Sequence, residues 1–170
     1  PGYSESVRNS LIGLMGRPSK ELDFTDVGAG TGIWARMVHD ADVKRCVALE
    51  PNDDMRRQGV IDSTGTNIEW AYGNAEETGL PDNSIDWVSM ASSFHWVNFE
   101  RSMYEFQRIL RPKGYFTALW NPRLVENSPV LLDIERHITE LSPNLKRVSS
   151  GLSGITNSLS DKLWGSPYFD

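Results

Sequence analysis

The chain has a single cysteine, Cys46, among its 170 residues. A disulfide framework or a cysteine-based zinc site needs several cysteines, so the composition excludes both, and we predict no metal centre. One lone cysteine fits a reducing compartment, and we expect a cytoplasmic protein. No stretch approaches the roughly 18 consecutive apolar residues of a membrane span. The amino terminus also lacks the basic-then-apolar pattern of a signal peptide.

Basic residues are also few, because 17 Lys and Arg stand against 23 Asp and Glu, for a net charge of −6. A nucleic-acid groove needs clustered Lys and Arg to neutralise phosphates. The pairs Lys44–Arg45 and Arg56–Arg57 are too short for that and indicate solvated faces. We therefore expect a small-molecule partner, not a nucleic acid or a membrane. The composition gives no sign of an oligomeric state.

The chain does contain a regular alternation of apolar runs and helical patterns from about residue 23 onward. The predicted strands cover Asp23–Val27, Arg45–Leu49, Asn67–Tyr72, Ser84–Ala91 and Tyr115–Trp120. The predicted helices cover Glu5–Met15, Thr31–His39, Asn52–Val60, Asn98–Leu110 and Ser128–Leu141. Strands separated by helices predict an α/β fold with a doubly wound, mostly parallel sheet and right-handed crossovers.

A glycine-rich turn, Asp26-Val27-Gly28-Ala29-Gly30-Thr31-Gly32, follows the first predicted strand. Glycines are needed where a ligand approaches bare backbone, because a Cβ would block the turn or the ligand. A dinucleotide fingerprint would place a third glycine where this chain has Ile33. Asp26 is placed to meet an ammonium group, directly or through water. A ligand with an amino-acid moiety and a ribose, such as S-adenosylmethionine, therefore fits better than NAD.

An acid, Glu50, ends the second strand eighteen residues after Gly32. A carboxylate there can accept both hydroxyls of a ribose, and such charge-assisted bonds are strong. The alternative is an acid that stabilises the start of the next helix. Met55, one turn onward, either lies against an adenine face or packs in the core. After the third strand, Asn74 either accepts from an adenine amino group or simply forms a turn.

The fourth strand runs into Ala91, Ser92, His95 and Trp96. In doubly wound sheets this end borders the ligand crevice. Small Ala91 and Ser92 let the backbone approach a ligand, and His95 and Trp96 are predicted to face the reacting centre. His95 is either a general base or a histidine packed under the following helix.

These pieces together resemble the class I S-adenosylmethionine-dependent methyltransferases over roughly residues 1–121. The matching segments are Asp26–Gly32, Leu49-Glu50-Pro51, Gly73-Asn74-Ala75-Glu76 with Leu80-Pro81, Ser84–Val88 and Arg108–Gly114. Ser93-Phe94-His95-Trp96-Val97 and Leu119-Trp120-Asn121 are similar to a subgroup that includes trans-aconitate-type methyltransferases. The resemblance implies a Rossmann-like methyltransferase fold. Asn74 departs from the usual acid before Ala75, and Lys113 replaces a common glycine.

The resemblance also implies roles for individual residues. Gly28, Ala29, Gly30 and Gly32 would contact the methionine end of the donor. Glu50 and Pro51 would lie at its ribose, and Asn74, Ala75 and Glu76 at its adenine. Tyr3, in a stretch similar to an R-P-x-Y lead-in, joins His95 and Trp96 as a predicted lining of the acceptor pocket.

The second predicted part of the chain, residues 122–170, is a helical or irregular lid or insertion. It includes a Ser/Gly/Asn-rich tract over residues 149–160. Members of the resembled fold usually carry seven strands, and five are predicted here. We therefore expect a chain truncated at its carboxyl terminus that lacks the last two strands.

The sequence thus predicts methyl transfer from S-adenosylmethionine to an oxygen, nitrogen or carbon of a small molecule by in-line displacement. One alternative is a donor-binding module or degenerate fragment without turnover. A nicotinamide-dependent oxidoreductase is a weaker alternative, because Ile33 interrupts the dinucleotide fingerprint.

Overall fold

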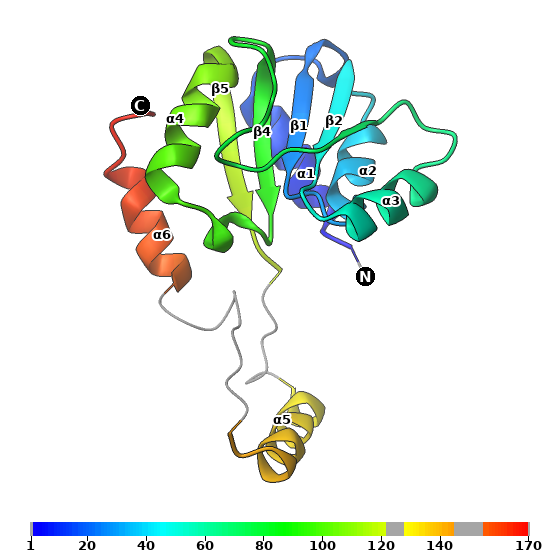
Figure 1. The fold of residues 1–170 in the computed structure, drawn as a ribbon, viewed down its shortest axis with the longest axis vertical. Helices are drawn as coiled ribbons and strands as arrows, with labels where there is room; N and C mark the ends of the chain where they lie inside the picture. The colour runs from blue at the N-terminus through cyan, green and yellow to red at the C-terminus, as the bar shows by residue number, and fades with distance from the viewer. Residues whose placement is uncertain (1, 122–127, 145–154, 170) are drawn as a thin grey trace. The chain divides into compact units, whose positions relative to one another are not determined.

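A computed structural model describes residues 2–121, 128–144 and 155–169. Its centre is a five-stranded, all-parallel sheet in the order β3-β2-β1-β4-β5. The strands are β1 (Asp23–Val27), β2 (Arg45–Leu49), β3 (Glu69–Ala71), β4 (Ile85–Ala91) and β5 (Leu110–Leu119). The predicted α/β class with a parallel sheet is therefore confirmed, and β1 and β2 have the predicted bounds (Figure 1).

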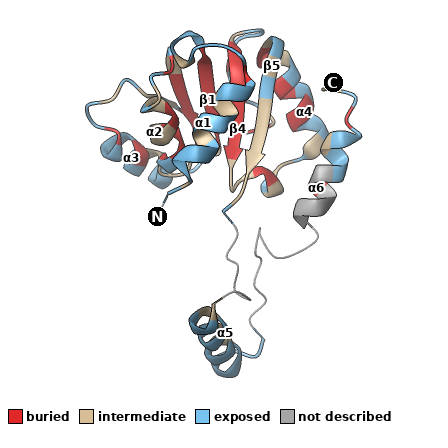
Figure 2. Cartoon of the chain, turned by 180° about the vertical axis from the view of Figure 1, so that it is seen from behind, coloured by how far each residue is buried: buried red, intermediate tan, exposed pale blue. Residues whose placement is uncertain are grey.

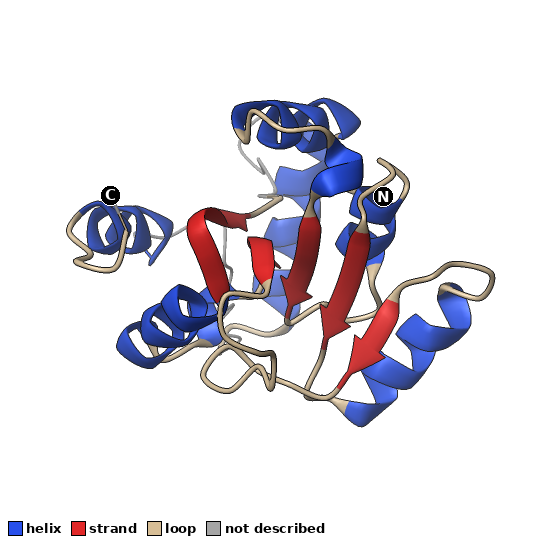
Figure 3. Ribbon diagram, turned by 90° about the horizontal axis from the view of Figure 1, so that it is seen from above, coloured by secondary structure: helices blue, strands red, loops and turns tan. Residues whose placement is uncertain are grey.

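Helices cover both faces of the sheet (Figure 3). The α-helices are α1 (Glu5–Leu14), α2 (Ile33–His39), α3 (Asp53–Asp62), α4 (Phe99–Ile109), α5 (Pro129–Leu141) and α6 (Ile155–Trp164). Two short 3₁₀ turns, η1 (Ser19–Glu21) and η2 (Phe94–Trp96), complete the described elements. None of the helices in the described ranges has the length and hydropathy of a membrane span.

The core lies on both sides of the central strands, which Figure 2 shows as buried for β1 and β4. On one face, Trp34 of α2 meets Trp87 of β4 edge-on, and Phe24 of β1 packs beside Trp87. On the other face, Phe106 of α4 packs against Phe116 of β5. Burial of each such side chain contributes roughly 1.5–3 kcal/mol. All five residues of β1 are buried and β4 is mostly apolar, as expected for parallel strands covered on both faces.

Two predicted strands differ from the structure by several residues, and β4 begins at Ile85, one residue after the predicted Ser84. β3 is limited to three residues, because only Glu69–Ala71 pair with β2 at the edge of the sheet. β5 begins at Leu110 instead of Tyr115, since Leu110 already lies opposite Ile85. The segment Pro112-Lys113-Gly114, which lies between the predicted helix and the predicted strand, is an irregularity between the two paired stretches, where Lys113 has φ 65°.

The chain divides into two compact units. One comprises the chain up to Leu119 and the last residues from Ser166 onward, and the other runs from Trp120 to Gly165. The tail therefore belongs with the first unit, where Phe169 stacks on Phe116, whereas the predicted boundary had grouped it with residues 122–165. In the second unit, the predicted helix Ser128–Leu141 is α5, and the Ser128 side chain caps it by accepting from the backbone of Leu131. Residues 122–127 and 145–154, most of the predicted polar tract, lie outside the described residues.

Candidate active site

The glycine turn after β1 is held by the end of the neighbouring strand. The backbone N–H groups of Gly28 and Ala29 both donate to the Leu49 carbonyl oxygen, at 2.9 and 3.0 Å. Gly28 and Gly30 have φ values of 70° and 59°, in the region that side chains rarely adopt. A Cβ on Gly28 would also lie 2.9 Å from the Ser93 side chain. The turn therefore requires glycine at Gly28, as the sequence predicts, because both conformation and space demand it.

Glu50 follows β2 and reaches back to the same turn. Its Oε2 accepts from the Gly30 N–H at 2.7 Å, and its Oε1 accepts from the Asn52 N–H at 2.9 Å. The residue is only 6% exposed, yet it lines a cavity. A carboxylate has about four acceptor positions, so the two backbone bonds leave capacity for two more donors. Asn52, not Glu50, caps α3, because its Oδ1 accepts from Asp54 and Met55.

The cavity has a volume of about 570 Å³ and lies where the glycine turn, Glu50 and the end of β4 come together. Its lining residues are Tyr3, Gly28–Thr31, Ile33, Trp34, Glu50, Pro51, Met55, Asn74–Glu76, Met90–Ser93, Trp96 and Val97. Such a volume is that of a small-molecule site. The position agrees with the rule that open α/β sheets bind ligands outside the carboxyl ends of their strands.

Most of the predicted site residues therefore meet in one place. Those that line the cavity are Tyr3, Gly28, Ala29, Gly30, Glu50, Pro51, Met55, Asn74, Ala75, Glu76, Ala91, Ser92 and Trp96. Asp26, Gly32 and His95 do not line it. Gly32, with φ 80°, is required for another reason, because a Cβ there would lie 2.6 Å from the Trp70 indole ring.

Asp26 lies on β1, two residues before Gly28, and is completely buried. Neither of its carboxylate oxygens has a hydrogen-bond partner among the described residues. Burial raises the pKa of Asp26 to about 8, with a further rise from the charge of Glu50, whereas the Ala35 backbone N–H opposes the rise without reaching hydrogen-bond geometry. A buried carboxyl group without partners is costly to ionise, so the neutral form predominates at pH 7.

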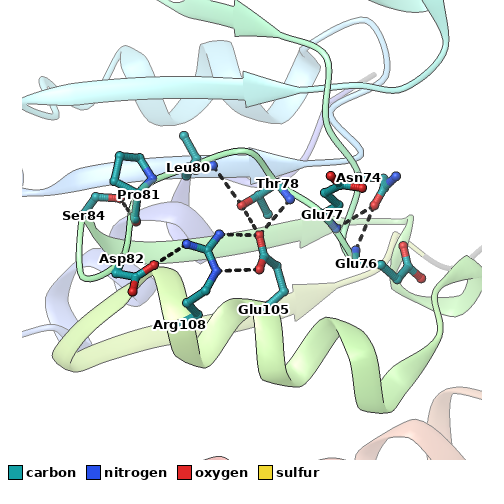
Figure 4. A network of polar contacts seen from close by, with 10 residues as sticks. All are labelled: Asn74, Glu76, Glu77, Thr78, Leu80, Pro81, Asp82, Ser84, Glu105 and Arg108. Atoms are coloured by element: carbon teal, nitrogen blue, oxygen red, sulfur yellow. Dashed lines mark hydrogen bonds and ion pairs between the residues drawn. The ribbon is translucent and has the colours of Figure 1, made fainter.

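The loop from Asn74 to Ser84 is fixed by a polar network on α4 (Figure 4). The Glu105 carboxylate accepts from the Thr78 N–H at 2.8 Å and from two Arg108 nitrogens at 2.7 and 2.8 Å. Burial acts to raise the pKa of Glu105, but the hydrogen bonds from Arg108 and Thr78 outweigh it and lower the pKa. Arg108 also pairs with Asp82. The ionised network holds the loop, and with it Asn74, against the cavity.

The side-chain oxygen of Asn74 accepts from the backbone N–H groups of Glu76 and Glu77, at 3.0 and 2.8 Å. This is the turn-forming role that the sequence left open beside the adenine role. The oxygen keeps no more than a poorly oriented lone pair for an adenine amino group. The neighbouring backbone of Ala75 remains on the cavity wall.

The amino-terminal segment contributes Tyr3, which sits edge-on against Trp34 with ring centroids 5.4 Å apart. Its phenol shares a 2.8 Å hydrogen bond with the Ser92 hydroxyl. Ser92 has φ 59°, a strained conformation for a serine, and its N–H donates to the Leu119 carbonyl. Strained residues of this kind cluster at functional sites. Tyr3 and Ser92, each predicted separately as a site residue, are therefore hydrogen-bonded to each other in the lining of the cavity.

His95 lies on η2 next to Trp96, and their ring centroids are 4.8 Å apart. Burial lowers the pKa of His95, so the imidazole is neutral at pH 7. Trp96 is 71% exposed and lines the cavity, whereas His95 does not. Of the two residues predicted to face the reacting centre, the structure thus brings Trp96 to the cavity wall.

Several lining residues were not predicted from the sequence: Thr31, Ile33, Trp34, Met90, Ser93 and Val97. Of these, Ser93 has a clear structural role. Its hydroxyl donates to the Val27 carbonyl at 3.1 Å and so connects the segment after β4 to the glycine turn. The adjacent small residues Ala91 and Ser92 were the signal that could have extended the prediction to it.

Comparison with known proteins agrees with this geometry. A methyltransferase-domain family matches residues 25–118. Uncharacterized methyltransferases of Mycobacterium bovis and Mycobacterium tuberculosis are 39% identical over 125 residues, which is 72% of this chain and 47% of theirs. A ubiquinone/menaquinone biosynthesis C-methyltransferase of Methylobacterium nodulans is 32% identical over 126 residues, 69% of this chain and 50% of that protein. The chain spans about half the length of these relatives.

Among solved structures, an S-adenosylmethionine-dependent methyltransferase from Mesorhizobium loti superposes with a TM-score of 0.57 at 21% identity. The match covers 64% of this chain and 51% of that one. At this identity the likeness shows the shared fold.

Proposed function

Because the chain belongs to the class I S-adenosylmethionine-dependent methyltransferases, we propose that it transfers a methyl group from S-adenosylmethionine to a small-molecule acceptor. The observation that carries the proposal is that the glycine turn, Glu50 and the Asn74–Ala75 segment all line the same cavity. These are the groups expected to face the amino-acid tail, the ribose and the adenine of the donor, in that order along the chain.

The residues present fit the donor in two independent respects. The backbone at Gly28 and Gly30 is bare on the cavity side, and both glycines have positive φ, so a ligand can lie directly on the main chain. Asp26 is a buried acid with two unpartnered oxygens next to that turn, which is a suitable neighbour for an ammonium group. Glu50 would accept the ribose hydroxyls with its remaining lone pairs, and the Ala75 N–H would donate to an adenine ring nitrogen.

When bound, the donor supplies a sulfonium whose methyl carbon is attacked by the acceptor as the carbon–sulfur bond breaks. The positive charge on sulfur disappears in this step, so an apolar wall does not oppose it. Met90, Trp96 and Val97 give the cavity such a wall. The chain's main contribution is therefore the alignment of two reactants, which is worth roughly 7–11 kcal/mol when the geometry is good.

We propose a small molecule as acceptor because the chain is acidic overall, with a net charge of −6, and because the cavity is small-molecule sized. Tyr3 and Trp96 are the predicted acceptor-side residues on its wall. The relative named as a C-methyltransferase favours a carbon nucleophile over oxygen or nitrogen. In this proposal, neutral His95 acts as a base only if the acceptor must lose a proton. The narrower likeness to trans-aconitate-type enzymes stays a prediction.

The nicotinamide alternative fits less well. Ile33 stands where a dinucleotide site needs a third glycine, and its side chain lines the cavity. Isothermal titration of the 170-residue chain with S-adenosylhomocysteine and with NADH separates the two ligands. We expect binding of S-adenosylhomocysteine alone, and binding of NADH alone would refute the proposal.

Turnover is tested separately with methyl-labelled S-adenosylmethionine and a panel of small-molecule quinols, phenols, carboxylic acids and amines. We expect label transfer to at least one acceptor. Tight donor binding without transfer to any acceptor would instead support the donor-binding module.

A further inference from the structure

Asp26 is the one fully buried acid among the described residues that has no hydrogen bond to either side-chain oxygen. The other buried acids of the sheet are satisfied. Asp86, for example, accepts from the Asp23 N–H and from Arg17 and Arg111. A buried acid without partners costs several kcal/mol if it is ionised, and a fold keeps such a group when something else completes it.

The groups around Asp26 leave it neutral in the ligand-free protein. Across the sheet it lies opposite Ala48 of β2 and Ser89 of β4, neither of which titrates in this range. The Ser89 hydroxyl accepts from the Trp34 indole at 2.9 Å. From α2, Asp26 faces the Ala35 backbone N–H.

Three titratable side chains lie within electrostatic range of Asp26: Glu50 after β2 raises the pKa of Asp26, and a charge on Asp26 would raise the pKa of Tyr3 before α1 and of Cys46 on β2. Burial raises the pKa of the Tyr3 phenol and that of the Cys46 thiol, so both stay protonated below pH 9. Glu50 carries the nearby negative charge that disfavours a second anion. No positively charged side chain acts on Asp26 from these elements in the part of the chain described.

Resting on the proposed function, we infer that the donor site is a proton-for-cation exchange site, in which Asp26 releases a proton when the donor's ammonium group binds. The O–H bond of the Asp26 carboxyl breaks, the proton passes to the solvent buffer, and the ammonium group keeps its own three protons. The site thus gains one positive charge and one negative charge together. The opposite charge next to Asp26 offsets the cost of ionising it.

Two consequences follow for binding. Below pH 8 the ligand competes with a proton, so its dissociation constant falls by about tenfold for each pH unit between pH 6 and 7 and levels off above pH 8. A ligand without the amino group does not release the proton, so adenosine binds with no such dependence.

The test is isothermal titration of the 170-residue chain with S-adenosylhomocysteine at pH 7, in phosphate and in Tris buffer. These buffers differ in ionisation enthalpy, so the difference between the measured enthalpies gives the number of protons released. We expect close to one proton per ligand for the natural chain and for Asp62→Asn, a control at an exposed acid at the end of α3. We expect close to zero for Asp26→Asn and for adenosine on the natural chain.

The measurement on the natural chain needs no variant, so the inference can be judged even if Asp26→Asn does not fold. Binding of S-adenosylhomocysteine with no proton release, or with the same release from adenosine, overturns the inference and leaves the proposed function intact. Unchanged release in a folded Asp26→Asn variant also overturns it. Failure of S-adenosylhomocysteine to bind at any pH between 6 and 9 overturns both.

Discussion

Replacement of Glu50 by alanine tests the ribose assignment directly. A hydrogen bond to a charged group contributes roughly 1.5–3 kcal/mol, so Glu50→Ala should weaken binding of S-adenosylhomocysteine by about 10- to 150-fold. The structure adds a complication, because Glu50 also accepts from the Gly30 and Asn52 N–H groups. The alanine variant would therefore loosen the turn as well as remove the ribose partner.

A ligand change separates these two effects. The affinities of S-adenosylhomocysteine and of its 2′-deoxy analogue are measured by titration on the natural chain and on Glu50→Ala. If Glu50 binds the ribose, the natural chain prefers the 2′-hydroxyl by at least about 1.5 kcal/mol, and the variant loses that preference. Glu21→Ala is the matched control, because Glu21 is an exposed acid on η1, at the opposite end of β1 from the turn.

The reasoning is refuted if the preference for the 2′-hydroxyl is the same in both proteins. Glu50 would then act only by holding Gly30, and both ligands would weaken equally. Unchanged affinity for both ligands would be a stronger refutation, because it would remove Glu50 from the site altogether.

Three further predictions concern residues that do not line the cavity. In the folded chain Asp26 keeps its proton up to its pKa of about 8, whereas in the unfolded chain it loses the proton near pH 3.8. The free energy of unfolding therefore decreases as the pH rises between these two values, by at most about 6 kcal/mol. In Asp26→Asn, urea denaturation followed by tryptophan fluorescence from pH 5 to 8 should lack that fall, and an identical fall in the variant would contradict the assignment. His95→Ala should lower the turnover rate more than donor affinity, measured with labelled donor and any accepted acceptor, and the reverse pattern would remove His95 from catalysis. Gly32→Ala should destabilise the chain by about 1–3 kcal/mol in urea, because its Cβ meets the Trp70 ring, whereas Gly13→Ala on α1, with open space around it, should be neutral or stabilising.

The sheet was largely predictable because parallel strands buried on both faces are written as apolar runs with sharp ends. Arg45–Leu49 is such a run, whereas Asp23–Val27 has only Phe24 and Val27 as apolar residues and is marked instead by the glycine turn that follows it; the structure has the predicted bounds for both. The second half of β5 was predicted, but its start at Leu110 was not. Leu110 pairs before the Pro112–Gly114 irregularity, and a strand interrupted in this way has no continuous pattern. The bounds of β3 depend on which residues reach β2, which only the assembled sheet decides.

The parts of the site that are formed by the main chain could be predicted from the sequence. Glycines at Gly28 and Gly30 mark where a ligand can approach, whichever rotamers surround them. Side-chain roles were harder. The sequence cannot show that the Asn74 oxygen is occupied by its own turn, or that Gly32 is needed to accommodate Trp70. Nor can it show that both oxygens of the Asp26 carboxyl are buried without a partner, because this depends on the neighbours that the fold brings to it.

The spacing between the glycine turn and Glu50 matters through the register of β1 and β2. Val27 lies opposite Leu49, so Gly28, Ala29 and Gly30 meet the Leu49 carbonyl and the Glu50 carboxylate in succession. Three consecutive N–H groups of the turn are thus fixed by the last residue of β2 and the residue that follows it.

A slip of one residue between these strands would turn Glu50 to the other face of the sheet and leave the Gly30 N–H without its carboxylate. The turn therefore has its conformation in the absence of ligand, and ligand binding carries no entropic cost of ordering it. Glu50, the proposed ribose acceptor, therefore also holds the Gly30 backbone, on which the amino-acid tail of the ligand would lie. A variant at Glu50 must accordingly be judged by ligand discrimination, since loss of affinity alone does not separate its two roles.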